Sequence, residues 1–439
     1  MRDRRAEKSG GFANSTKPST QSPPSEVHPV RRISRLGLPH FNWSLTLLGL
    51  CVFTFAVVTY RLPIGEVGIA IAAVGLVLQL GNVRVPFPVW LYGAFVLWTF
   101  AASLTSSYAD IALDAVLERL KLLAIMLIVV NALRTEGQLR FYLMFFLGCF
   151  VLFPVRGTLL GGDEIMGRAV WNYVYNNPND LATLCLIALG IALGFVFAKP
   201  SRALVRLGAG ISAILLVVVI LLTQSRGAFI GLVAGMGPAL IWLGLKRPGR
   251  LFLSAGILAL VIGLAIPESV WERLSGIEKL TSVSKIAEAD PEGSAEQRFE
   301  IQKVGWQIFL DNPVFGVGLG AYPLENARYA PELGRKDTHN TYLNVAAEVG
   351  LPGFALWCAL VWSVLRYAYR SRRRAAPGEL ATQQAWLEGA LWGYLAASMF
   401  GTYARLTFPY LMLAVLWCSA ALLASQSQQR ESTARTMNA

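Results

Sequence analysis

The sequence predicts an all-α, polytopic membrane protein with about twelve transmembrane helices and one large loop outside the membrane. Hydrophobic residues make up 54% of the 439 residues and charged residues only 15%, against roughly 25% charge in an average soluble domain. Long apolar runs recur along the chain, and basic residues gather in the connections between them. A soluble protein of this length could not bury so much apolar surface in one core, so lipid must surround much of it.

Runs of about twenty mainly apolar residues mark the individual spans. We place them at 42–60, 64–81, 86–105, 111–133, 139–160, 180–198, 208–224, 227–245, 250–266, 343–367, 382–403 and 407–425.

The distribution of basic residues sets the expected orientation. Alternate connections share an excess of Lys and Arg, namely Arg84, Arg134, Arg140, Lys199, Arg202, Arg206, Lys246, Arg247, Arg250, Arg366, Arg370, Arg372, Arg373 and Arg374. The short connections on the other side carry only Arg61, Arg156, Arg168, Arg226 and Arg405. Cytoplasmic loops are the ones enriched in Lys and Arg, so both termini are predicted to be cytoplasmic.

This orientation divides the chain into five parts. Residues 1–40 form a basic, disordered cytoplasmic tail, because they are polar and rich in Ser and Pro. Spans one to nine occupy 41–266, the large outer loop 267–341, the last three spans 342–425, and a second cytoplasmic tail 426–439. Apolar spacing predicts two helices within the loop, at 268–289 and 294–310. Long loops of this kind are usually functional.

Composition also excludes some functions. The net charge of +12 does not indicate nucleic acid, because no basic patch is interleaved with stacking aromatic residues. The five cysteines all lie in apolar runs and are predicted to be small core residues. A metal site is not expected, since the outer side has a single histidine and no Cys/His cluster. No cofactor motif is present; a site outside the cytoplasm therefore needs a substrate that is already activated.

His339 is the one histidine on the predicted outer side, just before a span. Histidine is the side chain best matched to acid–base chemistry near neutral pH, so His339 is a candidate catalytic base. The simpler interpretation of its surroundings is a helix cap, formed by Asp337, Thr338 or Asn340. That interpretation explains the neighbours of the histidine but leaves the histidine itself without a role.

Arginines supply the second half of the candidate chemistry. Arg226 lies at the turn between two long apolar spans, where an arginine is expensive to bury and is a functional candidate by default. Its planar guanidinium suits a pyrophosphate. Arg298 lies on the second loop helix, and Arg156 and Arg168 flank the small outer loop 161–178 as weaker candidates for the same anion. The loop ends in Asn-Pro-Asn-Asp at 177–180, primarily a turn and helix-cap signal.

Four motifs give the sequence a resemblance to the O-antigen ligase/polymerase superfamily of bacterial envelope glycosyltransferases. They are Ser225-Arg226-Gly227-Ala228, Asn312-Pro313-x-x-Gly316-x-Gly318-x-Gly320, His339-Asn340-x-Tyr342-Leu343 and Glu348-x-Gly350-Leu351-x-Gly353. They span about 205 to 365, and the plan of twelve spans with one large outer loop covers the rest. Within the superfamily, the sequence resembles the ligases closely.

The resemblance implies a GT-C-like glycosyltransferase of the bacterial inner membrane with a periplasmic active site. Such ligases transfer O-antigen glycan from undecaprenyl pyrophosphate to a sugar of lipid A–core, without metal or ATP. It implies that His339 is the general base and that Arg226 and Arg298 contact the pyrophosphate. Arg156, Arg168, Asn340 and Tyr342 are expected to bind substrate. A single displacement would invert the anomeric centre.

Three alternatives stay open from the sequence. An O-antigen polymerase uses the same donor with a second lipid-linked glycan as acceptor, and a protein O-oligosaccharyltransferase uses a Ser or Thr acceptor. A transporter for a lipid-linked anion belongs to a different class. It would need charged groups deep within several spans, whereas here they gather at the outer ends, and no internal repeat is apparent.

Overall fold

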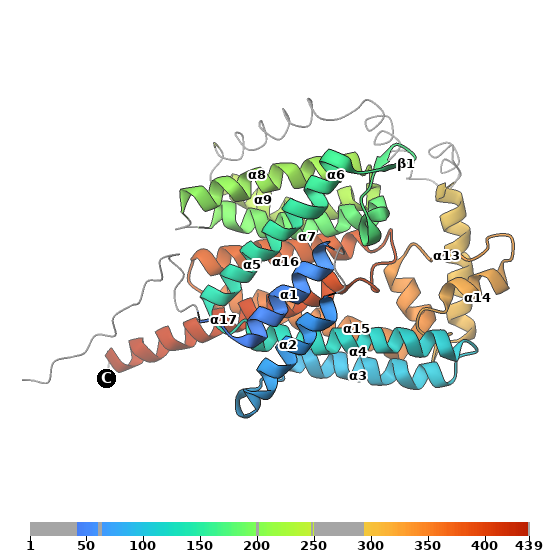
Figure 1. Ribbon diagram of the computed structural model, residues 1–439, viewed down its shortest axis with the longest axis horizontal. Coiled ribbons are helices and arrows are strands. Elements are labelled where there is room, and N and C mark those ends of the chain that lie inside the picture. The colour runs from blue at the N-terminus through green and yellow to red at the C-terminus, as the bar shows by residue number, and fades with distance from the viewer. Residues whose placement is uncertain (1–41, 60–63, 199–201, 247–248, 250–293, 438–439) are drawn as a thin grey trace, which may run out of the picture.

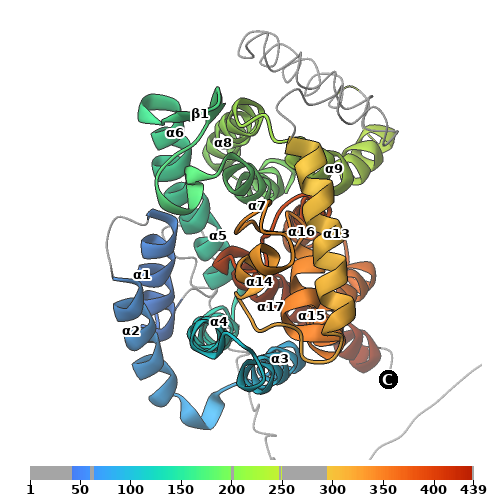
Figure 2. The same ribbon diagram turned by 90° about the vertical axis from the view of Figure 1, so that its right-hand side faces the viewer.

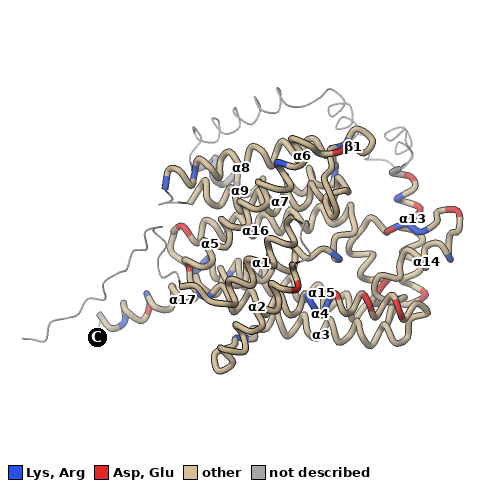
Figure 3. The backbone as a smooth tube through the Cα atoms, viewed as in Figure 1, with Lys and Arg blue, Asp and Glu red and all other residues tan. Residues whose placement is uncertain are grey.

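A computed structural model describes residues 42–59, 64–198, 202–246, 249 and 294–437. Long helices lie side by side in one bundle, and two helices of the large loop lie at one end of it, far from the C-terminus (Figure 1). Charged residues are sparse along the middle of the long helices (Figure 3). The predicted span 250–266, the predicted loop helix 268–289 and the N-terminal tail lie outside the described residues.

The helices of the first half follow the apolar runs. They are α1 (Leu45–Thr59), α2 (Gly65–Val77), the short η1 (Leu80–Asn82), α3 (Phe87–Leu104), α4 (Ala109–Ala132), α5 (Glu136–Phe150), η2 (Val151–Val155), α6 (Arg156–Gly161), α7 (Pro178–Phe197), α8 (Ala203–Leu222) and α9 (Arg226–Lys246). The π-turn η2 contains Pro154, which cannot donate a helical hydrogen bond, so the predicted span 139–160 is a helix interrupted near its end.

The second half consists of α13 (Ser294–Asp311), α14 (Tyr322–Tyr329), α15 (Thr341–Arg374), α16 (Glu379–Ala397) and α17 (Thr407–Met437). α13 confirms the second predicted loop helix, and α17 continues the last predicted span into the C-terminal tail. A small hairpin of β1 (Glu164–Ile165) and β2 (Arg168–Ala169), followed by η3 (Tyr173–Asn176), lies between α6 and α7. The hairpin is the one departure from an all-α fold among the described residues.

Every predicted span within the described residues overlaps a helix. The predicted span 382–403 extends too far, because α16 ends at Ala397 and residues 398–403 belong to the loop before α17. Six of these helices are long and apolar enough to cross a membrane, namely Phe87–Leu104, Glu136–Gly161, Pro178–Phe197, Ala203–Leu222, Thr341–Arg374 and Thr407–Thr433. The chain is therefore a mainly helical polytopic membrane protein. The full count of about twelve spans stays a prediction.

Glycines set the close packing of α9 on α16. Gly231 and Gly235 of α9 face Gly393 and Gly389 of α16, and a Cβ built at Gly235 would meet the carbonyl oxygen of Gly389. Membrane helices commonly use such small residues four apart to bring their backbones together. This contact fixes the start of α9, where Arg226 lies, relative to the loop that follows α16.

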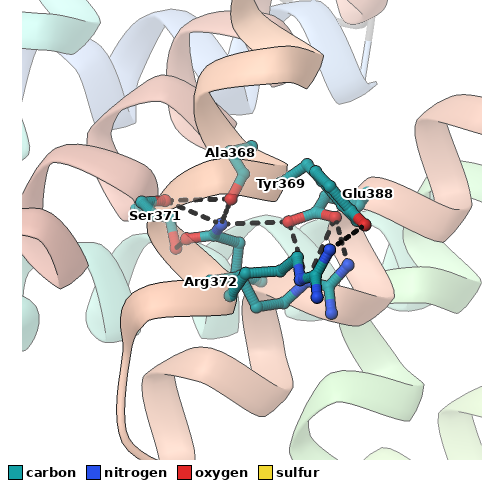
Figure 4. Close-up of polar contacts among 8 residues, drawn as sticks. Ala368, Tyr369, Ser371, Arg372 and Glu388 are labelled. Carbon is teal, nitrogen blue, oxygen red and sulfur yellow. Dashed lines mark hydrogen bonds and ion pairs between the residues drawn. The ribbon is translucent and has the colours of Figure 1, made fainter.

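A buried ion pair joins α15 to α16 near the end of the bundle away from α13. Arg372 Nη2 donates to Glu388 Oε2 at 2.8 Å, and its Nε lies 3.1 Å from both carboxylate oxygens (Figure 4). Gln384 donates to the same carboxylate at 3.0 Å and to the carbonyl oxygen of Ala368 at 2.6 Å. The carboxylate is thus both paired and hydrogen-bonded, which is the condition for burying a charge between helices.

α15 is not one continuous helix, contrary to the single predicted span 343–367. Gly350 has φ 67° and ψ −178°, which breaks the helix. Two residues on, Pro352 has no N–H to offer the carbonyl of Glu348. That carbonyl instead accepts from Gly318 N at 2.9 Å, the carbonyl of Ala347 accepts from Val317 N at 3.0 Å, and Leu351 N donates to Pro313 O at 2.8 Å.

The loop 312–320 therefore completes the hydrogen bonding of the break in α15. Its glycines follow from this role: Gly316, Gly318 and Gly320 all have positive φ, and a Cβ at Gly316 would meet the backbone of Glu348. Backbone without helical partners is tolerated at membrane depth only where protein satisfies it. The two glycine-containing motifs thus belong to one structural unit, which supports the start of α15.

Candidate functional site

The loop between α16 and α17, residues 398–406, lies at the centre of the candidate site and was not singled out from the sequence. It contacts the start of α15 through backbone and hydroxyl groups. Thr341 N donates to Ser398 O at 2.9 Å, Thr341 Oγ1 donates to Gly401 O at 2.7 Å, and Tyr403 N donates to Thr341 Oγ1 at 2.8 Å. The Oγ1 atoms of Thr338 and Thr402 are 3.3 Å apart. His339 lies in the chain between Thr338 and Thr341, which both contact this loop, so its backbone is held against the loop.

The same loop also contacts the segment that carries Arg226. Arg226 is the first residue of α9, and a Cβ on the next residue, Gly227, would lie 2.8 Å from Phe400 Cβ. Gly227 is therefore required for the close approach of the loop. Loop 398–406 thus contacts both the Arg226 segment and the His339 segment, which are far apart in the sequence.

His339 is half-buried and has an unusual backbone conformation. Its φ is +50°, a region that non-glycine residues seldom occupy and that is frequent at functional sites. Burial, together with the positive charges of Arg298, Lys336 and Arg405, lowers the pKa of its imidazole from 6.5 to about 4. The imidazole is therefore neutral near pH 7 and has a lone pair available to accept a proton.

α13 brings Arg298 to this end of the bundle. Ile301 and Ile308 are fully buried against Tyr322, Val317 and Ala347. Gly305 packs against Tyr322, since a Cβ added at Gly305 would lie 2.9 Å from the Tyr322 hydroxyl oxygen. Arg298 is one helical turn before Ile301 and so lies on the same inward face of α13. Figure 2 shows α13 crossing the end of the bundle beside α14.

The small loop before α7 joins the site through Arg168. Arg168 Nε donates to Thr223 O at 2.8 Å, and its Nη2 donates to Asn179 Oδ1 at 2.8 Å. Ser225 Oγ lies 2.9 Å from the same Asn179 oxygen. The side chain of Arg168 therefore fixes the turn that precedes Arg226.

The charges of Arg298 and Arg168 both act on the buried Tyr403 of loop 398–406. Burial raises the pKa of its phenol, the charge of Asp180 adds to that effect, and the charges of Arg298 and Arg168 oppose it. Both arginines are therefore close enough to Tyr403 to act on it electrostatically. Arg298, Arg168, His339 and the Arg226 segment thus gather around loop 398–406.

The other predicted site residues have different surroundings. Asn340 is the N-cap of α15, since its Oδ1 accepts from Tyr342 N at 3.0 Å and Leu343 N at 3.2 Å; the simple cap interpretation is confirmed for this residue. The Tyr342 hydroxyl donates to Leu395 O at 2.8 Å. Arg156 is exposed at the start of α6 and contacts none of the clustered residues among those described. Substrate binding by these three side chains stays a prediction.

Arg405 is a further charged residue of the site that sequence reasoning counted only as an outer arginine. It lies 3.6 Å from the Asp337 carboxylate and 3.8 Å from that of Asp180. Asp180 belongs to the Asn-Pro-Asn-Asp sequence, in which Asn177 caps α7 and accepts from Asn179 N at 2.9 Å, as its turn-and-cap pattern predicts. The signal that could have identified Arg405 is an arginine in an otherwise apolar connection between two spans.

One comparison with known proteins agrees with the resemblance to the O-antigen ligases. The O-antigen ligase family model matches residues 211–358, a range that contains Arg226, Arg298 and His339. The comparison with curated proteins found no match. Among solved structures, a chain from "Structural coordination of polymerization and crosslinking by a peptidoglycan synthase complex" is 18% identical, covers 77% of this chain and 96% of that one, and has a TM-score of 0.42. A similarity at that level says nothing about activity.

Proposed function

We propose that this protein, a member of the O-antigen ligase superfamily through its residues 211–358, transfers a glycan from undecaprenyl pyrophosphate to a sugar hydroxyl of lipid A–core. The observation that supports the proposal most is the gathering of His339, Arg298, Arg168 and the Arg226 segment around loop 398–406. A neutral imidazole beside several guanidinium groups suits the removal of a hydroxyl proton next to a departing pyrophosphate.

The proposed reaction is a direct displacement. The acceptor hydroxyl oxygen attacks the anomeric carbon of the donor while the bond from that carbon to the pyrophosphate oxygen breaks. The hydroxyl proton passes to His339, and undecaprenyl pyrophosphate leaves. A single displacement inverts the anomeric configuration.

The charges in the site fit these roles. Arg226 and Arg298 can stabilise the negative charge that grows on the leaving pyrophosphate, and arginine is suited to this by its planar pair of donors. Before the donor binds, burial and neighbouring positive charges keep His339 weakly basic. The negative charges of a bound pyrophosphate would offset those positive charges and strengthen the base.

Replacement of His339 tests the proposal directly. We expect His339→Ala to lose glycan transfer, by about 10²-fold or more, in proteoliposomes containing undecaprenyl-pyrophosphate glycan and lipid A–core. Arg335→Ala, at an exposed position of the same loop, is the control and should transfer normally. Near-normal transfer by a folded His339→Ala protein would reject the histidine as base.

Arg226→Lys tests the role of the guanidinium. Lysine keeps the charge and loses the bidentate geometry, so transfer should fall while the protein still folds; loss of one such contact typically costs about 10²–10³ in rate. Unchanged donor turnover would contradict a role for Arg226 at the pyrophosphate.

A cellular experiment separates ligase from polymerase. Loss of a ligase leaves bare core lipopolysaccharide, whereas loss of a polymerase leaves core with one repeat unit. We expect bare core when the gene for this protein is removed. Core with a single repeat would assign the same site to polymerisation.

A further inference from the structure

An open cavity lined by both polar and apolar groups lies beside the candidate site. Its volume is about 480 Å³, and its lining residues come from the loop before α7, the start of α7 and the loop before α17: Tyr173, Val174, Asn176, Asn177, Asp180, Arg405, Leu406 and Thr407. Pockets for small molecules usually measure about 300–1,000 Å³ and place a few polar groups in an otherwise apolar wall.

The cavity holds a buried carboxylate with a single charged partner. Asp180 is 6% exposed, and its one ion-pair partner among the described residues is Arg405 at 3.8 Å, which is longer than a hydrogen bond. Arg405 itself is 56% exposed in its side chain. The pair therefore retains hydrogen-bonding capacity toward whatever occupies the cavity, and charged groups form the stronger hydrogen bonds.

The rim of the cavity is held in place by buried neighbours. Tyr175 is fully buried, its hydroxyl donates to Val58 O at 3.0 Å, and Trp171 N donates to its carbonyl at 2.9 Å. Tyr173, between them, is 65% exposed and has φ +56°. An exposed aromatic ring in a strained backbone conformation, anchored on both sides, is preorganised to present its face to a ligand.

Ion pairs of Arg405 link the cavity wall to the loop that carries His339. Arg405 links Asp180 to Asp337, which is two residues before the histidine, and the charge of Arg405 acts on the imidazole. A group seated in the cavity would therefore lie next to the loop in which the proposed base is held.

We propose that this cavity binds a saccharide ring, with Asp180 and Arg405 hydrogen-bonding its hydroxyls and Tyr173 packing against its apolar face. Amide, carboxylate and guanidinium groups beside an aromatic face match a ligand that is densely hydroxylated on its edges and apolar on its faces. The proposal rests on the glycosyl transfer proposed above. The ring could belong to the acceptor or to the first sugar of the donor glycan, and these share the same chemistry.

Two variants test the saccharide site. Asp180→Asn keeps the shape of the side chain and replaces its carboxyl group with an amide, and Tyr173→Ala removes the exposed ring. Glu164→Gln, an exposed carboxylate on the hairpin outside the cavity, is the matched control. The apparent KM for lipid A–core is measured at saturating donor, and the apparent KM for the donor at saturating lipid A–core.

We expect Asp180→Asn to raise one of these KM values by about tenfold or more, and Tyr173→Ala to raise the same one, while Glu164→Gln changes neither. A rise for lipid A–core assigns the cavity to the acceptor, and a rise for the donor assigns it to the donor glycan. Unchanged KM values in both variants, or a fall in kcat alone, would overturn the proposal.

A binding measurement separates this proposal from the proposed function. Deacylated lipid A–core oligosaccharide and the free donor glycan are titrated against the full-length protein in detergent. We expect one of them to bind the wild type and Glu164→Gln, and to bind Tyr173→Ala at least about tenfold more weakly. Binding of this kind without glycan transfer would contradict the proposed function and leave the saccharide site standing. Equal affinity of wild type and Tyr173→Ala would reject the site.

Discussion

At the scale of single residues, the site contains several positive charges that lower the pKa of its proposed base. Arg298, Lys336 and Arg405 all act on His339 and oppose its protonation. Burial lowers the pKa of the imidazole further. An anionic substrate held by the same arginines would offset their charges, though not the burial, and so raise that pKa. The arrangement thus links the strength of the base to the presence of the donor.

The pH dependence of kcat/KM tests this link. The pKa of His339 is lowered to about 4, so the imidazole is neutral above that pH and loses its function as a base only when the pH falls through it. The acid limb for the wild type should therefore lie well below pH 6.5. Lys336→Glu replaces a positive charge near the imidazole with a negative one, which raises the pKa and moves the acid limb to higher pH.

Arg335→Glu makes the same charge change at the neighbouring exposed position, and Arg335 is not among the groups that lower the pKa of His339. It should leave the acid limb in place. Equal profiles for Lys336→Glu and wild type would show that His339 does not determine the limb.

Individual site residues differ in how well the sequence predicts them. The residue types and positions of His339 and Arg226 indicate them as candidates, and the family resemblance adds Arg298; the roles of all three stay predictions. Arg405, Asp180 and Tyr403 were missed, because their importance comes from contacts between segments far apart in the chain. Arg405, for example, contacts Asp180 and Asp337, and hydropathy or spacing carries no information about such contacts.

At the scale of elements, the break in α15 determines where His339 lies. The short segment before Gly350 carries the cap at Asn340, and loop 312–320 supplies the hydrogen bonds that the break would otherwise leave unmade. Trp98 adds a further bond from its Nε1 to Val349 O at 2.8 Å. The sequence predicted a single span here, because hydropathy averaged over a window does not register a change in one backbone angle.

Gly350→Ala tests the break. An alanine at φ 67° and ψ −178° is strained, and its Cβ would meet the carbonyl oxygen of Val314. We expect a loss of about 1–3 kcal/mol or more in unfolding free energy, together with weaker transfer because the start of α15 shifts. Thermal unfolding in detergent measures the loss.

Gly208→Ala is the matched control, because Gly208 lies within α8 and a Cβ there meets nothing within 4 Å. Alanine is the better helix former, so this variant should unfold at the same or a slightly higher temperature. If both variants unfolded alike, the break in α15 would not depend on glycine.

At the scale of the whole molecule, the site lies at the start of α15, and α13 and α14 lie at one end of the bundle (Figure 1). Arg372, which pairs with Glu388, lies in the last turn of α15, far along the helix from the site. Helix positions followed well from apolar runs, since each span must satisfy its own backbone in lipid. The side of the membrane that each end faces is predicted from basic residues alone. It is therefore the property of the whole molecule that most needs a test.

Cysteine labelling of spheroplasts provides that test. In a protein whose five native cysteines are replaced by alanine, Lys336→Cys reports on the site end and Gln429→Cys on the exposed last turns of α17. If the excess of basic residues marks the cytoplasm, a membrane-impermeant maleimide should label Lys336→Cys in intact spheroplasts and Gln429→Cys only after lysis. The reverse pattern would turn the site toward the cytosol, away from any periplasmic acceptor, and the proposed glycan transfer would be untenable.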